Sequence, residues 1–381
     1  MAAGADRGRT SAGWTGGVPE GMQGAVPGEP SDDSALPAQR SREDQDDGER
    51  EALAASAVGR LWRRWGWAVR WTGTLLGVLY VATLIDVASL RAALVTVSFA
   101  VVIVAAALTA TGQVIGSVRW RILLSAYGAQ TRPSLATAVR LYFVAGFYNT
   151  FLPGAVAGDV VRAVVTRASF EDHGTTGALA VVFVERILGL FAVFALVLAG
   201  VALSSDALAI HASLRTWSVI GGAASLACTL ALPLGRRLAR FLPGPLARIA
   251  RRLPSVVRLR AFATAVVLSL CTQGTSVIAG WLVLRAMHPG VTFTDALLIV
   301  PAAVATAILP ITVGGIGARE AVFVVLCGRL LGLASEDAVA ASLLLWLAML
   351  IVGAAGGVLV LIATAQRPRG GGPRRPRARP A

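Results

Sequence analysis

Runs of about twenty apolar residues recur along the chain, and they restrict the possible fold more than any other sequence feature. A helix of this length crosses the roughly 30 Å hydrocarbon core of a bilayer. Of the 381 residues, 55% are hydrophobic, and the mean hydropathy is +0.68. The sequence therefore predicts an all-α polytopic membrane protein. We expect about six full transmembrane helices, at 67–86, 94–116, 175–204, 216–234, 262–284 and 338–364.

The two ends of the chain differ in composition from this apolar body. The N-terminal end is rich in Gly, Pro, Ser and acidic residues, and the C-terminal end is rich in Arg and Pro. Such compositions are typical of disordered segments. We therefore expect a disordered cytoplasmic tail at 1–58, a transmembrane domain at 59–365 and a basic disordered cytoplasmic tail at 366–381.

The net charge of +14 is concentrated on the membrane body, because eleven of the 21 acidic residues lie within the first 51 positions. Basic loops beside apolar spans orient the spans and contact anionic lipid, so this charge predicts no nucleic-acid partner. The segment 236–260 contains eight Arg and no acidic residue. The positive-inside rule then places both termini in the cytoplasm of a multi-pass cell-membrane protein.

Two further regions, 133–170 and 292–333, are apolar but interrupted by Pro and Gly. In the orientation above, the first begins and ends on the cytoplasmic side, and the second begins and ends outside. Each is therefore predicted to be a re-entrant pair of half-helices or a pair of short crossing helices. Broken backbone at membrane depth is tolerated only where it is buried in protein or lines a polar cavity.

These two regions contain similar segments, "FLPGAVAGDVVR" (151–162) and "ILPITVGGIGAR" (308–319). Aligned without gaps, the segments pair Pro153 with Pro310, Gly158 with Gly315 and Arg162 with Arg319. Because one copy enters from inside and the other from outside, the match predicts an inverted repeat, an arrangement that points to a transport site near the midplane. Chance matches in a chain rich in Leu, Gly and Arg are the alternative.

Two adjacent charged residues, Glu185 and Arg186, lie well inside the predicted span 175–204. Each costs roughly 2.5–3.5 kcal/mol at the centre of an isolated membrane helix. They point about 100° apart on the helix, so each needs a partner elsewhere. The candidate partners are Arg162 or Arg319 for Glu185, and Asp159 or Glu320 for Arg186. An ion pair that only fixes helix register is the alternative to a transport pathway.

The broken regions also suggest a ligand. Free N–H groups and a partial positive charge at half-helix N-termini suit a phosphate, and so do Arg guanidinium groups. The candidate residues for a lipid headgroup are Asn149, Gly158, Asp159, Arg162, Glu185, Arg186, Arg319 and Glu320. The residues expected to shape the broken helices are Pro153, Gly154, Pro310, Gly314, Gly315 and Gly317. Asn149 is equally well interpreted as a cap or turn residue. The few His and Cys residues lack ligand spacing, so we expect no metal and no cofactor.

One basic segment, "RWRILLSAYG" (119–128), follows the second predicted span. It has an amphipathic pattern, with aromatic residues of the kind that anchor helices at a membrane surface. We therefore expect it to lie in the inner interface, with Trp120 and Tyr127 as anchors and Arg119 as a cytoplasmic topology signal.

Three segments, "RLYFVAGFYNTFLPGAVAGDVVR" (140–162), "VVFVERILGL" (181–190) and "ILPITVGGIGAREAVF" (308–323), carry a family resemblance in their residues, order and spacing. With these segments the chain resembles the lysylphosphatidylglycerol synthase transmembrane-region family. This is the flippase-like membrane domain of multiple peptide resistance factor proteins, and it also occurs as stand-alone proteins. One departure is Ala157, where family members commonly have a second Gly before the Gly-Asp pair.

The resemblance implies a role in moving a lipid between membrane leaflets, and it leaves the lipid open. In two-part members a soluble aminoacyltransferase domain follows the membrane domain. This chain instead ends in a short basic tail, so we expect it to have no synthase activity and not to be an enzyme. The expected partners are a phospholipid or lipid-linked substrate and a separately encoded transferase. Two alternatives stay open: a membrane scaffold for an aminoacyl- or glycosyltransferase, and a lipid-modifying enzyme using Asp159 with Glu185.

Overall fold

The described part of the chain in this computed structural model is helical and contains no strand. It comprises Ala68, Thr312 and the ranges 71–152, 157–170, 174–204, 212–231, 239–241, 256–308 and 315–365, all within the unit Val58–Ala381. Both predicted tails lie outside the described residues, as do Pro153, Gly154, Pro310 and Gly314.

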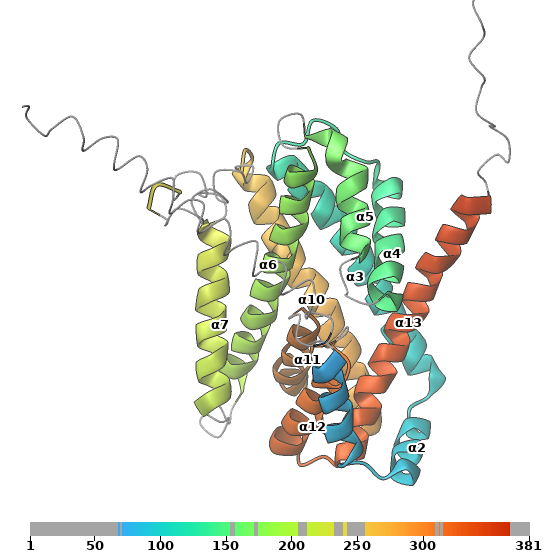
Figure 1. The fold of residues 1–381 in the computed structure, drawn as a ribbon. Helices are drawn as coiled ribbons and strands as arrows, with labels where there is room; N and C mark the ends of the chain where they lie inside the picture. The colour runs from blue at the N-terminus through green and yellow to red at the C-terminus, as the bar shows by residue number, and fades with distance from the viewer. Residues whose placement is uncertain are drawn as a thin grey trace, which may run out of the picture. The chain divides into compact units, whose positions relative to one another are not determined.

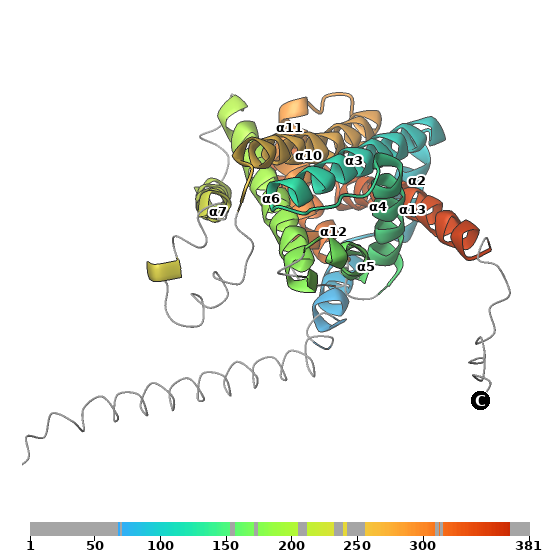
Figure 2. The ribbon, with the colours of Figure 1, turned by 90° about the horizontal axis from the view of Figure 1, so that it is seen from above.

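Four helices of the described part are long and apolar enough to cross a membrane. They are α3 (Phe99–Ala126), α6 (Gly174–Leu203), α10 (Leu259–Met287) and α13 (Ser335–Ala365). Each matches one predicted span, because long apolar runs specify a helix through period and length alone. α3 and α10 pack along each other, as the views in Figures 1 and 2 show.

The first predicted span, 67–86, is not one continuous helix. A helix at Trp71–Ala82 stops, and the chain turns by 90° into α2 (Val87–Thr96). Asp86 begins α2, and its Oδ2 accepts a hydrogen bond of 2.8 Å from the Ser89 N–H. A carboxylate at this N-cap favours a new helix over continuation of the old one. The described residues therefore contain four spanning helices, or five if this bent pair is one span.

A second difference concerns the predicted span 216–234. It corresponds to α7 (Ala212–Ala231), whose apolar sequence is diluted by Arg215 and by several Ser, Thr and Gly. α7 packs against α6 and lies beside it at the edge of the helix group (Figure 2). The predicted number of six full spans is therefore not confirmed.

The two Pro- and Gly-interrupted regions each form a pair of short packed helices. Region 133–170 contains α4 (Leu135–Phe151), α5 (Ala157–Thr166) and the short η2 (Arg167–Ser169), and region 292–333 contains α11 (Phe293–Ile308) and α12 (Ala318–Leu331). The α4/α5 pair enters from the end where α3 stops, and the α11/α12 pair enters from the opposite end (Figure 1). An inverted repeat requires this arrangement, and the repeat itself stays a prediction.

Two glycines allow close backbone contacts that hold these short helices. At Gly158, a methyl group would lie 2.1 Å from the Ala145 carbonyl oxygen, so α5 packs directly on the α4 backbone. At Gly317, φ is +81°, and a methyl group would lie 2.9 Å from the Gly77 backbone. Gly158 was predicted to contact a lipid headgroup and Gly317 to shape a broken helix, and here each one admits a neighbouring helix.

The segment 119–128 does not present its aromatic residues to a membrane surface. Residues 119–126 form the last part of α3, and the exposed fraction is 0% for Trp120 and 4% for Tyr127. Both pack in the apolar core between α3, α5, α6 and α10. The prediction that Trp120 and Tyr127 anchor the segment at a membrane surface was wrong, because neighbouring helices cover both side chains.

The α4–α5 contact can be tested with Gly158→Ala. We expect it to lower the free energy of unfolding by about 1–3 kcal/mol, the range for overpacking a close contact. Thermal unfolding of the purified protein in detergent measures the change. Gly274→Ala in α10 is the control, because its added methyl group meets no atom within 4 Å. Equal melting temperatures for the two variants would contradict the close packing.

Candidate functional site

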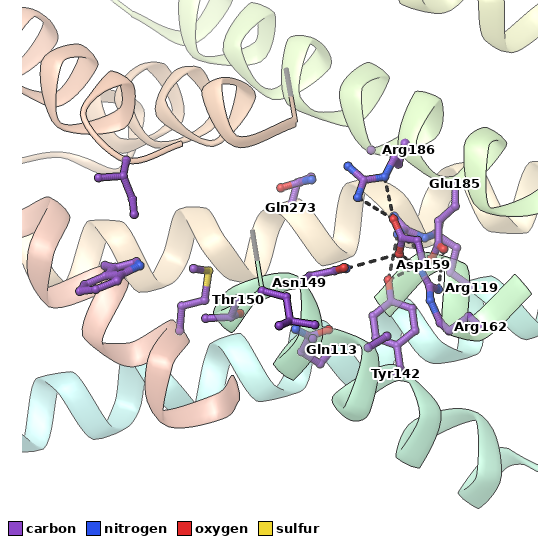
Figure 3. Close-up of a pocket in the computed structure, with 17 residues that line it drawn as sticks. Gln113, Arg119, Tyr142, Asn149, Thr150, Asp159, Arg162, Glu185, Arg186 and Gln273 are labelled. Carbon is purple, nitrogen blue, oxygen red and sulfur yellow. Dashed lines mark hydrogen bonds and ion pairs between the residues drawn. The ribbon is translucent and has the colours of Figure 1, made fainter. Parts of the chain in front are cut away.

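Five charged side chains from three helices meet in one buried cluster, shown in Figure 3. α3 contributes Arg119, α5 contributes Asp159 and Arg162, and α6 contributes Glu185 and Arg186. All but Arg186 are at most 5% exposed. We call these five residues the ionic cluster.

Glu185 joins the three helices α3, α4 and α5 to α6. Its Oε1 accepts hydrogen bonds from Arg119 Nη2 at 3.0 Å and from the Tyr142 hydroxyl at 2.9 Å. Its Oε2 accepts one from Arg162 Nη1 at 2.7 Å. Both carboxylate oxygens are thus used, as a buried charge requires. Of the two predicted partners of Glu185, the structure has Arg162.

Asp159 is the second carboxylate of the ionic cluster that binds two arginines. Its Oδ1 accepts a hydrogen bond of 2.6 Å from Arg162 Nη2, and its Oδ2 accepts one of 2.8 Å from Arg186 Nε. Of the two predicted partners of Arg186, the structure has Asp159. Glu185 and Arg186 diverge on α6 as expected, and Arg162 connects the two halves of the cluster by binding both carboxylates.

The two arginines that bind Asp159 differ in their surroundings. The guanidinium carbon of Arg162 lies 4.5 Å from the centre of the Tyr142 ring and 5.3 Å from that of Trp120, and its side chain is 6% exposed. Aromatic faces stabilise a desolvated cation. The Arg186 side chain is 32% exposed. Arg162 is therefore part of the protein core, and Arg186 is the arginine of the cluster most accessible to a ligand.

Asn149 closes the beginning of α5. Its Oδ1 accepts a hydrogen bond of 2.9 Å from the Gly158 N–H, and its Nδ2 lies 3.4 Å from Asp159 Oδ1. The capping interpretation of Asn149 is therefore confirmed, and this N–H of the half-helix is occupied by the protein. The phosphate-binding role predicted for the α5 N-terminus finds no support at Gly158.

The ionic cluster borders a cavity of about 330 Å³ between the helices. Its lining combines cluster residues with the amides of Gln113, Asn149 and Gln273. Its apolar lining includes Leu152, Ile316, Trp346 and Met349. The cavity thus offers charge, neutral hydrogen-bonding groups and apolar surface to one ligand, which is the composition of a small-molecule site.

Arg319 and Glu320 do not join the ionic cluster. Arg319 Nη2 donates to Glu320 Oε1 at 2.7 Å, and Ser342 of α13 donates to the same oxygen at 2.9 Å. Glu320 Oε2 accepts the Gly317 N–H at 2.7 Å, where the helix begins. The carboxylate folds back to the start of α12, which lets adjacent residues pair. The sequence analysis expected Arg162 and Arg319 around one phosphate, but they occupy separate clusters.

A second cavity, of about 240 Å³, lies beside Arg319 and Glu320 and is mostly apolar. Its walls come from the bent pair 71–96, the start of α12 and α13. Ile316 and Trp346 line both cavities, so these two side chains separate them. Within the described residues, no three His, Cys, Asp or Glu side chains are grouped for a metal ion.

Among the residues of the first cavity that the sequence did not predict, four have polar side chains that bear on its chemistry: Arg119, Tyr142, Gln113 and Gln273. Arg119 was assigned to a loop because the predicted span ended at 116, whereas α3 continues to Ala126. Gln113 and Gln273 lie within predicted spans, and a polar side chain in a membrane helix is itself a signal of function or helix contact. For Tyr142 no comparable signal exists, because an aromatic residue in an apolar helix has many structural roles.

A family model described as "Lysylphosphatidylglycerol synthase TM region" matches residues 70–357. The matched residues include the helix pairs α4/α5 and α11/α12, which we call hairpins. They also include the ionic cluster and the residues that line both cavities. No curated protein matches the chain.

The shared carboxylate can be tested with Glu185→Gln. The substitution leaves Arg119 without its buried counter-charge and Arg162 with Asp159 alone, so we expect a loss of about 3–5 kcal/mol in the free energy of unfolding. Thermal unfolding in detergent checks this value. Arg140→Gln is the matched control, because Arg140 lies exposed on α4. If both variants unfold at the same temperature, the ionic cluster does not hold these helices together.

Proposed function

We propose that this chain, which belongs to the lysylphosphatidylglycerol synthase transmembrane-region family, moves a lipid between the leaflets of the membrane. Family membership supports a lipid-related role in the membrane. The finer statement, that the lipid has an anionic or modified headgroup and crosses through the protein, is our proposal.

One observation carries the proposal: the ionic cluster sits beside a cavity inside a bundle of apolar helices. Three arginines and two carboxylates give the cluster a formal charge of +1. Ionisable groups at membrane depth are costly, and they mark substrate pathways more often than they stabilise a fold. A phosphate group carries the complementary charge and is the part of a lipid that cannot cross hydrocarbon unaided.

In this proposal the side chains have different tasks. Arg186 binds the phosphate, since it is the most exposed cation of the cluster and lines the cavity. Glu185 and Asp159 hold the arginines in place. The hairpins α4/α5 and α11/α12, entering from opposite ends, change position relative to each other and expose the site to either leaflet in turn.

In this proposal the protein carries out no reaction on the lipid that it moves. A transferase encoded separately would make or use the lipid that is moved. This partner is an inference from the family, whose two-part members join the membrane domain to a transferase.

Arg186→Gln tests the proposed phosphate contact. The purified chain is reconstituted into liposomes with fluorescent phosphatidylglycerol, and dithionite quenching measures transfer between leaflets. We expect transfer to slow at least about tenfold, because a hydrogen bond to a charged group contributes roughly 1.5–3 kcal/mol. Asp159 keeps its contact with Arg162, so the fold is retained.

Arg140→Gln is the control, since it removes the same charge from the exposed face of α4. Transfer by Arg186→Gln at the wild-type rate would overturn the phosphate contact. The absence of transfer by the wild-type chain, for every lipid tried, would overturn the function.

The charges at the two ends of the helix group support the predicted orientation. Six described arginines lie near the end where α3 stops and α4 and α10 begin: Arg121, Arg132, Arg140, Arg167, Arg258 and Arg260. The opposite end has four acidic residues, Asp86, Asp295, Glu336 and Asp337, beside four arginines, Arg91, Arg215, Arg285 and Arg329, so its described charges balance. The positive-inside rule assigns the first end to the cytoplasm.

Cysteine labelling tests this orientation. In a variant without the three native cysteines, Val87→Cys and Arg132→Cys each introduce one exposed thiol. A maleimide that does not cross membranes should label Val87→Cys on intact cells and Arg132→Cys only after lysis. The reverse pattern would contradict the orientation.

A further inference from the structure

Two glutamine side chains in the first cavity make no hydrogen bond to any described residue. Gln113 of α3 and Gln273 of α10 both line the cavity, as does the capping residue Asn149 (Figure 3). Asn149 is engaged by Gly158 and Asp159. The two glutamine amides therefore remain available, each with donors and an acceptor, inside an otherwise apolar bundle.

Each amide lies close to a glycine of a neighbouring helix. A methyl group added at Gly146 would lie 3.2 Å from Gln113 Nε2, and one added at Gly189 would lie 3.8 Å from Gln273 Nε2. Both glycines line the same cavity. Both side chains are half-buried and line the cavity. Amides in this position are suited to bind a ligand with neutral hydrogen-bonding groups.

The charges of the cavity wall point to the sign of that ligand. Asp159 and Glu185 are the acidic residues among the described lining residues, and each already binds two arginines. A cationic headgroup, such as one carrying a lysyl group, would have to compete with buried arginines for these carboxylates. An anionic headgroup meets a site whose formal charge is +1.

We propose that the lipid bound in this cavity has an anionic headgroup with free hydroxyl groups, a glycerol or sugar attached to phosphate, and that Gln113 and Gln273 bind those hydroxyls. This inference rests on the proposed function and names its substrate class. Arg186 contacts the phosphate, and the two amides distinguish a hydroxyl-bearing headgroup from a bare phosphate. A site built to bind a hydroxyl discriminates strongly against analogues that lack it, because its polar groups are then left unpaired.

The experiment compares four fluorescent lipids in liposomes containing the full chain. Phosphatidylglycerol and phosphatidylinositol carry hydroxyls, phosphatidic acid carries the phosphate alone, and lysyl-phosphatidylglycerol is cationic. We expect at least one of the two hydroxyl-bearing lipids to move at least about tenfold faster than phosphatidic acid and lysyl-phosphatidylglycerol.

The Gln113→Leu, Gln273→Leu double variant then tests the two amides. It should reduce transfer of the preferred lipid to the rate of phosphatidic acid and leave phosphatidic acid unchanged. Neither substitution removes a hydrogen bond within the described protein, so size-exclusion profiles and melting temperatures should match the wild type. Gln130→Leu, an exposed position between α3 and α4, is the matched control.

The outcomes separate the two proposals. Equal rates for all anionic lipids, faster transfer of lysyl-phosphatidylglycerol, or an unaffected preference in the double variant would each overturn the substrate class while leaving lipid movement intact. If no lipid moves at all, the proposed function itself fails. A hydroxyl preference that disappears with the two amides supports both.

Discussion

The bridge that Arg162 makes between Asp159 and Glu185 is the interaction on which the rest of the site depends. Its guanidinium contacts one carboxylate at 2.6 Å and the other at 2.7 Å, and it also lies over the rings of Tyr142 and Trp120. The bridge ties the half-helix α5 to the long helix α6, and Glu185 extends it to Arg119 of α3. A hairpin that does not span the bundle gains a fixed position this way, since its short helices bury little apolar surface alone.

This arrangement also separates structural charges from accessible charges. Arg119 and Arg162 are buried and paired with carboxylates, whereas Arg186 reaches the cavity while remaining paired with Asp159. Breaking a buried ion pair is strongly destabilising, so the inner charges are suited to holding helices. A ligand phosphate then needs to bind only Arg186. The same cavity presents two amides without protein partners, which adds selectivity for neutral groups to the selectivity for charge.

The two cavities give the α11/α12 hairpin a different character from its α4/α5 counterpart. Here the carboxylate of Glu320 accepts hydrogen bonds from Arg319, from Ser342 of α13 and from the Gly317 N–H at the start of its own helix. The cavity beside it is mostly apolar. The segments "FLPGAVAGDVVR" and "ILPITVGGIGAR" share spacing, yet Arg162 binds across helices and Arg319 binds locally. If the repeat is an inverted one, its two halves have diverged from headgroup contact toward apolar contact.

The sequence by itself determined the helical membrane class, four of its six predicted spans, the two interrupted regions and the pairing candidates of Glu185 and Arg186, because apolar runs and charges within them can be read along the chain. It did not determine where the first apolar run bends, since the cap at Asp86 competes with continuation of a helix. It placed Arg119 outside the membrane body and Arg319 beside Arg162, because it contains no distances between segments. Only the tertiary structure decided which arginines share a carboxylate, which one reaches the cavity, and that Gln113 and Gln273 face the same space. These are contacts between helices far apart in the chain, and packing alone selects them.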